Sequence, residues 1–270
     1  MKSLNTGNSR ESTFTRREML RSTGHGVTLA ALASAVGCST AGMGERENIV
    51  GSTCLTILYR NGDNVTFDYD YYRDNHLTLI MERYGNDAIS RYEMHKPIVM
   101  PGAPPSPYVL HVNIYIRDAE AFAAAGAEQG EEVAADVPNF TNTGLVVQND
   151  IIWGESGGDL HSTELGQTCM AILYPHEEGA TFDPDYYRDK HMTLIMDLYG
   201  REAIRRFEVR KPAPLPQGNA PFMGCINFYI EDQAAFDAAG AEHTETLVAD
   251  VPNFSSVLPM VIPSVIYGIG

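Results

Sequence analysis

The sequence predicts an α+β fold in which two ferredoxin-like βαββαβ repeats pack sheet to sheet as a barrel within one chain. Three observations lead to this prediction. The block Tyr-Tyr-Arg-Asp-x-His occurs at residues 71–76 and again at 186–191. Residues 53–97 align without a gap to residues 168–212, and more than half of the paired positions are identical. Both copies then show the same alternation of strand and helix patterns, which indicates a duplication.

The elements of each repeat follow from local patterns. Asp68 is placed to cap the start of a helix, and Gly85 is placed to end it. A segment rich in proline and glycine predicts a loop, and an alanine-rich segment after Asp118 predicts a second helix. In chain order, repeat 1 is expected to contain a strand at 53–59, a helix at 68–85, a strand at 88–95, a loop at 97–107, a strand at 108–116, a helix at 118–135 and a strand at 142–153. This is the βαββαβ order.

One such unit covers only one face of its four-stranded sheet with helices. The other face is expected to be apolar, and two copies bury it by packing sheet on sheet. The domain boundaries that follow are a signal peptide at 1–37, a flexible start of the mature chain at 38–51, repeat 1 at 52–155, a linker at 156–166 and repeat 2 at 167–270.

The N-terminus carries the features of an export signal. Arg16 and Arg17 stand directly before a modest apolar stretch at 27–36, which is typical of twin-arginine signals. Cys38 ends a segment that resembles a lipoprotein cleavage box, while plain cleavage after Ala35 is the alternative. The sequence therefore predicts a protein exported by the twin-arginine machinery, either periplasmic or anchored to the membrane through lipidated Cys38.

Net charge limits the classes of ligand that the protein can bind, and cysteine spacing limits the sites that it can form. With 19 Lys and Arg against 35 Asp and Glu, the formal net charge is −16. Such a chain repels nucleic-acid phosphates and anionic lipid head groups, which leaves a small organic molecule as the expected ligand. Cys54, Cys169 and Cys225 have no metal-ligand spacing, and the sequence does not decide between buried thiols and a disulfide.

No metal site is predicted. His95 and His111 of repeat 1 become Arg210 and Cys225 in repeat 2, so they are not a shared ligand set. Phosphate-binding glycine loops and haem-attachment motifs are absent from the sequence. No cofactor is therefore predicted, and a haem or flavin held in the barrel stays as the weaker alternative.

His76 and His191 are the leading candidate catalytic residues. On an ideal helix, Tyr72 shares a face with His76, and Tyr187 shares a face with His191. The imidazole can act as an acid or base near neutral pH, and the phenol can donate a hydrogen bond. A buried structural histidine beside a packed aromatic ring is the alternative for each pair.

Six further residues are candidate ligand contacts. Asn113 and Tyr115 alternate on a strand, as Asn227 and Tyr229 do in the copy, and these side chains either line a cavity with the histidine or bond across the seam between the sheets. Asp136 and Asp250 open the two Asp-Val-Pro-Asn-Phe segments. A capping role in the turn is the favoured interpretation, and a role in orienting the histidine is the second.

At these positions the chain resembles the EthD family of the dimeric α+β barrel superfamily. The resemblance rests on Phe-Asp before each Tyr-Tyr pair, on the two histidines and on the two Asp-Val-Pro-Asn-Phe segments. It implies the ferredoxin-like barrel and a cleft between helices and sheet that holds the histidine. Similar barrels include cofactor-independent oxygenases, isomerases and lyases. The resemblance therefore implies several possible reaction types and does not select one.

The expected function is therefore an exported small-molecule oxidoreductase, similar to cofactor-independent oxygenases, or an isomerase. A histidine in each repeat would serve as acid or base. The rival is a non-catalytic periplasmic protein that binds a small molecule in the same clefts.

Overall fold

The computed structural model describes residues 49–99, 102–156 and 162–270, all of which lie in one compact unit of the chain. The predicted signal peptide, Cys38 and most of the predicted flexible start lie outside the described residues, as does part of the predicted linker.

The described elements follow the predicted order in both repeats. In repeat 1 they are β1 (Thr53–Arg60), α2 (Tyr69–Tyr71), a π-helical turn (Tyr72–His76), α3 (Leu77–Ala88), β2 (Ile89–Pro97), β3 (Tyr108–Ile116), α4 (Ala119–Asp136) and β4 (Leu145–Ser156). In repeat 2 they are β5 (Thr168–Pro175), α5 (Pro184–Tyr186), a π-helical turn (Tyr187–His191), α6 (Met192–Ala203), β6 (Ile204–Pro212), β7 (Phe222–Ile230), α7 (Gln233–Asp250) and β8 (Met260–Ile269). A short 3₁₀ turn follows α4 and α7.

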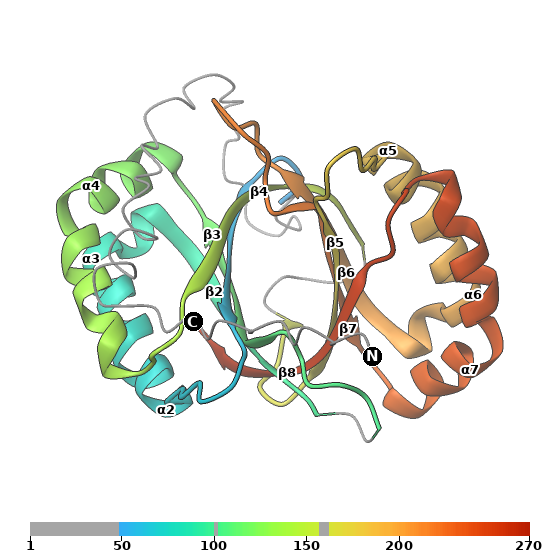
Figure 1. Cartoon of the computed structure of the whole chain (residues 1–270), viewed down its shortest axis with the longest axis horizontal. Helices are drawn as coiled ribbons and strands as arrows, with labels where there is room; N and C mark the ends of the chain where they lie inside the picture. The colour runs from blue at the N-terminus through green and yellow to red at the C-terminus, as the bar shows by residue number, and fades with distance from the viewer. Residues whose placement is uncertain (1–48, 100–101, 157–161) are drawn as a thin grey trace, which may run out of the picture. The chain divides into compact units, whose positions relative to one another are not determined.

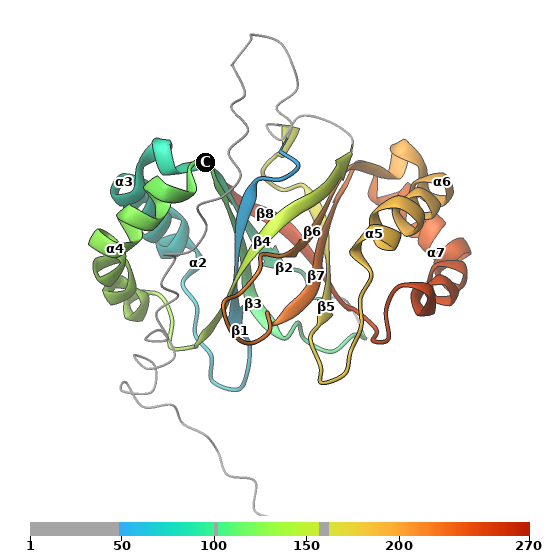
Figure 2. The same ribbon diagram turned by 90° about the horizontal axis from the view of Figure 1, so that it is seen from above.

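The eight strands form one closed antiparallel barrel in the order β1-β3-β2-β8-β5-β7-β6-β4. The last strand of each repeat pairs with the other repeat, β4 with β6 and β8 with β2. Figures 1 and 2 show the helices of the two repeats on opposite flanks of the barrel. The predicted α+β barrel within one chain is thereby confirmed, and its closure leaves no strand edge unpaired.

The helix boundaries have local causes. The carboxylate of Asp68 accepts a hydrogen bond from the backbone N–H of Tyr71, and that of Asp118 accepts one from Ala121. Gly85 has a φ of 77° and Gly200 a φ of 73°, a region that glycine enters without steric cost. The glycines therefore kink α3 and α6 three residues before these helices end and the chain enters β2 or β6.

The barrel interior corrects one expectation. The face of each sheet that the helices leave uncovered was expected to be apolar, but part of it carries charged and polar side chains that the closed barrel buries. Arginine and carboxylate side chains balance three against three in this interior, and all six are buried: Arg91, Arg206, Arg210, Glu93, Glu208 and Asp150. Leu58, Leu173 and Ile262 belong to an apolar cluster that fills another part of the barrel. Buried ions need such pairing to offset their desolvation.

None of the helices in the described ranges is long and apolar enough to cross a membrane.

Candidate functional site

A histidine and an aspartate form a hydrogen-bonded pair in each repeat. His76 Nδ1 lies 2.8 Å from Asp136 Oδ2, and His191 Nδ1 lies 2.8 Å from Asp250 Oδ2. Each histidine ends the π-helical turn, and each aspartate ends the second long helix of its repeat. The helices that carry these pairs lie on the flanks of the barrel, against its outer face (Figure 1).

The role of the aspartates differs from the favoured prediction. Asp136 and Asp250 were expected mainly to cap a turn, and the structure instead joins each carboxylate to the imidazole. A local contact accompanies this bond, since Asn139 donates to Asp136 and Asn253 donates to Asp250, both at 2.7 Å. The carboxylate therefore serves the turn and the imidazole together.

The tyrosine that joins the hydrogen-bond network is not the predicted one. Tyr71 OH donates to Asp136 Oδ1 at 2.9 Å, and Tyr186 OH donates to Asp250 Oδ1 at 3.0 Å. The prediction assumed ideal α-helical spacing, on which the residue four before the histidine shares its face. The π-helical turn instead closes i to i+5 bonds, and this brings the residue five before the histidine to the same carboxylate.

The predicted tyrosines pack directly on the imidazoles. The ring centroids of Tyr72 and His76 are 5.0 Å apart, as are those of Tyr187 and His191. The rings of Phe140 and Phe254 lie 4.6 Å from the same imidazoles and also contact the tyrosine rings. Each histidine thus belongs to a cluster of three mutually packed rings, which restricts its orientation.

The sequence contained the signal for the residues that the prediction missed. The Tyr71 and Tyr186 hydroxyls come from the repeated Tyr-Tyr pair, and the asparagines and phenylalanines come from the repeated Asp-Val-Pro-Asn-Phe segment. Assigning them to the site required the path of the chain after α4 and α7.

Burial controls the protonation of the site. It lowers the pKa of His76 and of His191, although the hydrogen bond to the aspartate partly opposes it. Burial alone would raise the pKa of Asp136 and Asp250. Hydrogen bonds from histidine, asparagine and tyrosine outweigh it, so both carboxyls have a lowered pKa. At neutral pH each pair is therefore a neutral imidazole that donates its Nδ1–H to a carboxylate.

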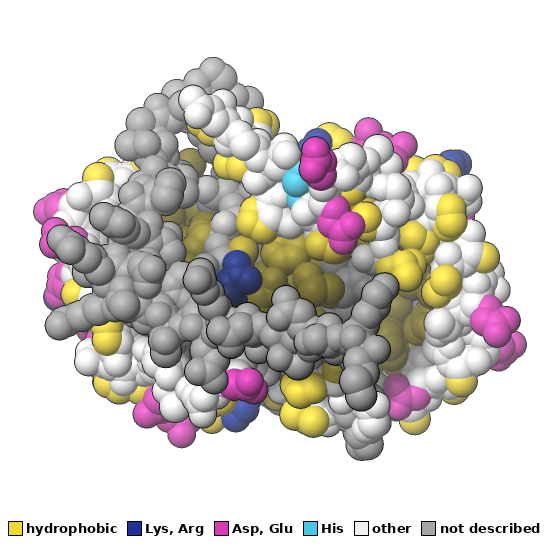
Figure 3. Space-filling view, viewed as in Figure 1, with side chains coloured by type: hydrophobic (Ala, Val, Ile, Leu, Met, Phe, Trp, Pro, Cys, Tyr) yellow, Lys and Arg dark blue, Asp and Glu magenta, His cyan; other side chains and the backbone are white. Residues whose placement is uncertain are grey.

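A cavity of about 420 Å³ adjoins His191 in repeat 2. It lies between α6 and α7 on one side and the outer face of the sheet on the other. Ile172, Ile195, Phe228 and Leu247 are among its apolar walls. Figure 3 shows apolar side chains gathered on this flank of the molecule. A cavity of this size and lining suits a small, mainly apolar molecule.

Tyr187 and His191 are the groups of the site that line this cavity. The Nδ1 atom of His191 is engaged by Asp250, and no described residue bonds to its Nε2 atom. Burial holds the pKa of the Tyr187 hydroxyl well above its usual range, so the phenol stays protonated. The cavity therefore meets an imidazole nitrogen that no described residue engages, and a tyrosine whose hydroxyl is hydrogen-bonded to Tyr174.

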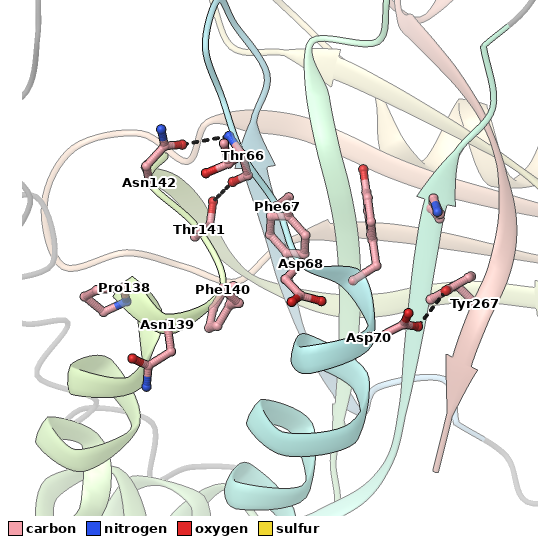
Figure 4. Close-up of a pocket in the computed structure, with 12 residues that line it drawn as sticks. Thr66, Phe67, Asp68, Asp70, Pro138, Asn139, Phe140, Thr141, Asn142 and Tyr267 are labelled. Atoms are coloured by element: carbon pink, nitrogen blue, oxygen red, sulfur yellow. Dashed lines mark hydrogen bonds between the residues drawn. The ribbon is translucent and has the colours of Figure 1, made fainter.

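A more polar hollow of about 580 Å³ lies at the start of the first helix in repeat 1 (Figure 4). Within it, Tyr267 OH donates to Asp70 at 2.8 Å. The Lys96 ammonium lies 4.1 Å from the ring centroid of Tyr69 and 4.7 Å from that of Tyr267. The hollow thus brings a strand of repeat 2 to the helix start of repeat 1.

Four predicted ligand contacts lie inside the barrel and are separated from the histidines by the sheet. Tyr115 OH donates to Glu208 at 2.8 Å, and Tyr229 OH donates to Glu93. The amides of Asn113 and Asn227 are completely buried in the same interior. The structure therefore adopts the second alternative, bonding across the seam between the sheets.

The barrel interior does not fit a haem or flavin, because the described side chains fill it. Arg206, Arg210 and Tyr229 are each at most 1% exposed there. Among the described residues there is no group of three or more His, Cys, Asp or Glu that could hold a metal ion. Cys54, Cys169 and Cys225 are free, buried thiols.

Comparison with known families gives two matches within the chain. The family described as EthD domain matches residues 65–144 and again residues 177–257. Each match contains one complete histidine–aspartate pair.

Three individual proteins illustrate what the chain is similar to. An uncharacterized 11.0 kDa protein from the thcB-thcC intergenic region of Rhodococcus erythropolis is 31% identical over 94 residues, covering 34% of this chain and 87% of that protein. An EthD-like protein from Ralstonia eutropha is 28% identical, covering 37% of this chain and 92% of its own, with a TM-score of 0.34. An anthrone oxidase-like protein covers 83% of this chain and 94% of its own at 12% identity, with a TM-score of 0.52. The last likeness is one of fold.

Proposed function

The chain belongs to the EthD family, with two copies of the domain, and we propose that it is an oxidoreductase that removes a proton from a small aromatic substrate and lets dioxygen oxidise the resulting anion. The observation that carries this proposal is the pairing of His191 with Asp250 beside an apolar cavity of about 420 Å³. A base with an unengaged nitrogen faces a site built for an apolar molecule.

The proposed chemistry begins with proton transfer. The carboxylate of Asp250 holds the Nδ1–H of His191, which leaves the lone pair on Nε2. Nε2 takes a proton from an activated CH₂ group or a phenol of the substrate, and Asp250 stabilises the imidazolium that forms. The Tyr187 hydroxyl exchanges its hydrogen bond with Tyr174 for one to the substrate oxygen on which negative charge develops.

The oxidation that follows balances with dioxygen as the only oxidant. The substrate anion reduces dioxygen, and a carbon–oxygen bond forms at the ring carbon. The imidazolium returns its proton to the peroxide, which loses water and leaves a carbonyl group. In sum, one CH₂ group and one dioxygen molecule give one C=O group and one water molecule.

The fold likeness to an anthrone oxidase-like protein suggests the substrate for a first test. Anthrone is a neutral tricyclic compound with an acidic CH₂ group beside two rings. An apolar cavity holds such a compound, and its apolar walls favour the neutral ketone over water. Repeat 1 carries the same histidine–aspartate geometry, so we propose the same chemistry at His76.

The test is oxidation of anthrone, followed by dioxygen consumption and by absorbance of the quinone. His76→Ala and His191→Ala, singly and together, separate the contributions of the two repeats. We expect the double variant to lose turnover by a factor of about 100 or more while it still binds the product quinone. Binding without turnover in the wild-type protein would instead identify a binding protein and would refute the enzyme.

We also propose that the protein acts outside the cytoplasm. Arg16 and Arg17 before the apolar stretch support export, and Cys38 supports a lipid anchor. Cell fractionation of the wild type and of the variant Arg16→Lys/Arg17→Lys tests export. Metabolic labelling with a fatty acid, compared between the wild type and Cys38→Ala, tests the anchor.

A further inference from the structure

We propose that Tyr174 is a further catalytic residue of the repeat 2 cavity, and that its hydroxyl and that of Tyr187 together bind one ketone oxygen of the substrate. The proposal rests on the proposed function for His191 and Asp250. It adds a residue to the site, and it narrows the substrate to aromatic ketones whose carbonyl oxygen becomes negative when the CH₂ group loses its proton.

Tyr174 reaches the cavity from the sheet. It lies near the end of β5, whereas Tyr187 and His191 belong to the π-helical turn, and all three side chains line the cavity. The rings of Tyr174 and Tyr187 meet edge to face, with centroids 5.7 Å apart. The ring of Tyr187 in turn lies 5.0 Å from that of His191. The cavity wall therefore brings two phenols from different elements into the neighbourhood of the base.

Packing fixes both phenols. Tyr174 is 2% exposed and Tyr187 is 1% exposed. The ring of Tyr174 lies 4.8 Å from that of Phe182 and 5.8 Å from that of Phe254. Rings that are already enclosed lose little further freedom when a ligand binds, so their hydroxyls are donors held in place before the reaction.

The hydrogen bond between the two hydroxyls leaves one proton unused. This bond raises the pKa of Tyr187 and lowers that of Tyr174, so Tyr187 is the donor and Tyr174 the acceptor. No described residue accepts a hydrogen bond from the Tyr174 hydroxyl. Burial raises the pKa of both phenols above the usual range, so both keep their protons at neutral pH. When Tyr187 turns to a ligand, two donors are therefore available.

Two neutral donors suit an oxygen that gains negative charge. A ketone oxygen has two lone pairs and can accept from both hydroxyls at once. When His191 removes a proton from the conjugated CH₂ group, negative charge moves onto this oxygen, and both hydrogen bonds become stronger. A hydrocarbon of the same size offers no acceptor. The phenol pair therefore favours ring ketones over hydrocarbons.

The test uses fluorenone, a flat aromatic ketone without a CH₂ group, which the proposed reaction cannot oxidise. Each hydrogen bond to a carbonyl oxygen lowers the C=O stretching wavenumber, so infrared difference spectra of fluorenone labelled at the carbonyl carbon report the donors. The background protein is the full chain with Tyr59→Phe/Tyr72→Phe, in which only repeat 2 keeps such a phenol pair. In it, the wavenumber of bound fluorenone should lie below the value in hexane. Tyr174→Phe and Tyr187→Phe should each raise the wavenumber and lower the affinity by a factor of about 3 to 10.

Tyr199→Phe is the matched control, because Tyr199 lines the same cavity but lies eight residues after His191, roughly 12 Å along α6. It should leave the wavenumber unchanged. Phenanthrene, a hydrocarbon with no acceptor, should bind every variant within about twofold of the background protein. An unchanged wavenumber in Tyr174→Phe, an equal rise in Tyr199→Phe, an equal loss of affinity for phenanthrene, or no binding of fluorenone would overturn the inference. Anthrone oxidation is measured separately, so a failure of the proposed reaction is distinguishable from a failure of ketone binding.

Discussion

Tyr186 and His191 bind the two oxygens of one carboxylate, with Tyr186 OH on Asp250 Oδ1 and His191 Nδ1 on Asp250 Oδ2. The tyrosine thus acts on the imidazole through the aspartate. The variant Tyr186→Phe keeps the hydrogen bond between the imidazole and the carboxylate. It removes one of the hydrogen bonds that fix the orientation of the Asp250 carboxylate. We expect kcat of repeat 2 to fall by a factor of about 3 to 10, with KM nearly unchanged. Steady-state kinetics in the His76→Ala background measure this, and an equal change in kcat and KM would contradict a positioning role.

Substitution of Asp250 should lower the catalytic rate of repeat 2 more than substitution of Tyr186. In Asp250→Asn the amide can donate to Nδ1, which places the imidazole proton on Nε2 and removes the base that faces the cavity. We expect kcat/KM of repeat 2 to fall by a factor of about 100 or more. The control is Asp232→Asn, since asparagine also caps a helix well and Asp232 only caps α7. Similar rates for Asp250→Asn and the wild type would exclude a base role for His191.

The pH profile follows from the direction of the histidine pKa. Burial lowers the pKa of His191 and of His76, so the neutral base persists to a more acidic pH than in a free imidazole. We expect kcat/KM to be constant near neutral pH and to fall on acidification with a midpoint below about 6.5. Rates of anthrone oxidation from pH 4.5 to 8 measure it. An acid limb centred above 6.5 would mean that the carboxylate, rather than burial, dominates.

The fold could be predicted from the sequence because the duplication repeats every local signal. Asp68 and Asp118 cap the starts of their helices through side-chain hydrogen bonds. Gly85 has a positive φ near the end of α3, as the sequence predicts for a glycine in that place. The pairing of β4 with β6 and of β8 with β2 could not be assigned this way, because hydrogen bonds between the repeats leave no local pattern. That the charged side chains of β2 and β6 are buried inside the barrel was missed for the same reason, since alternation shows a shared face and does not show what that face meets.

The site was predicted only in part. Tyr72 and His76 do pack together, and the repeated block located them. Tyr71 was misjudged because it joins the site through the carboxylate of Asp136, and Asp136 was misjudged because it is 60 residues from its histidine. Neither effect can be read from helical periodicity.

Gly154 is required by the packing at one seam between the repeats. A Cβ atom there would lie 2.8 Å from Arg188 Cγ, and the Arg188 guanidinium lies 5.1 Å from the Trp153 ring centroid. Gly154→Ala should push Arg188 off the ring and lower the free energy of unfolding by about 1 to 3 kcal/mol. Gly144→Ala is the control, because a Cβ there meets nothing within 4 Å. Urea unfolding measures both, and equal stabilities of the two variants would show that Arg188 adapts without cost.

Buried histidines should make the fold sensitive to mild acid. Burial lowers the pKa of His95 to about 3, whereas in the unfolded chain it is about 6.5. Below pH 6.5 the unfolded state therefore binds a proton that the folded state does not, so stability is full above pH 6.5 and falls as the pH drops toward 3. The loss from this residue approaches about 1.4 kcal/mol per pH unit.

The variant His95→Gln isolates this contribution, since glutamine has no titrating group. It should be less stable than the wild type at pH 7 because the contacts of His95 with Glu93 and Asn113 are disturbed. Its stability should nevertheless decline less steeply between pH 6.5 and 5. Urea unfolding followed through the fluorescence of Trp153, the one tryptophan of the chain, measures both slopes. Parallel curves would show that His95 takes up its proton in the folded state, and the charges of the barrel interior would then have to rearrange to accept it.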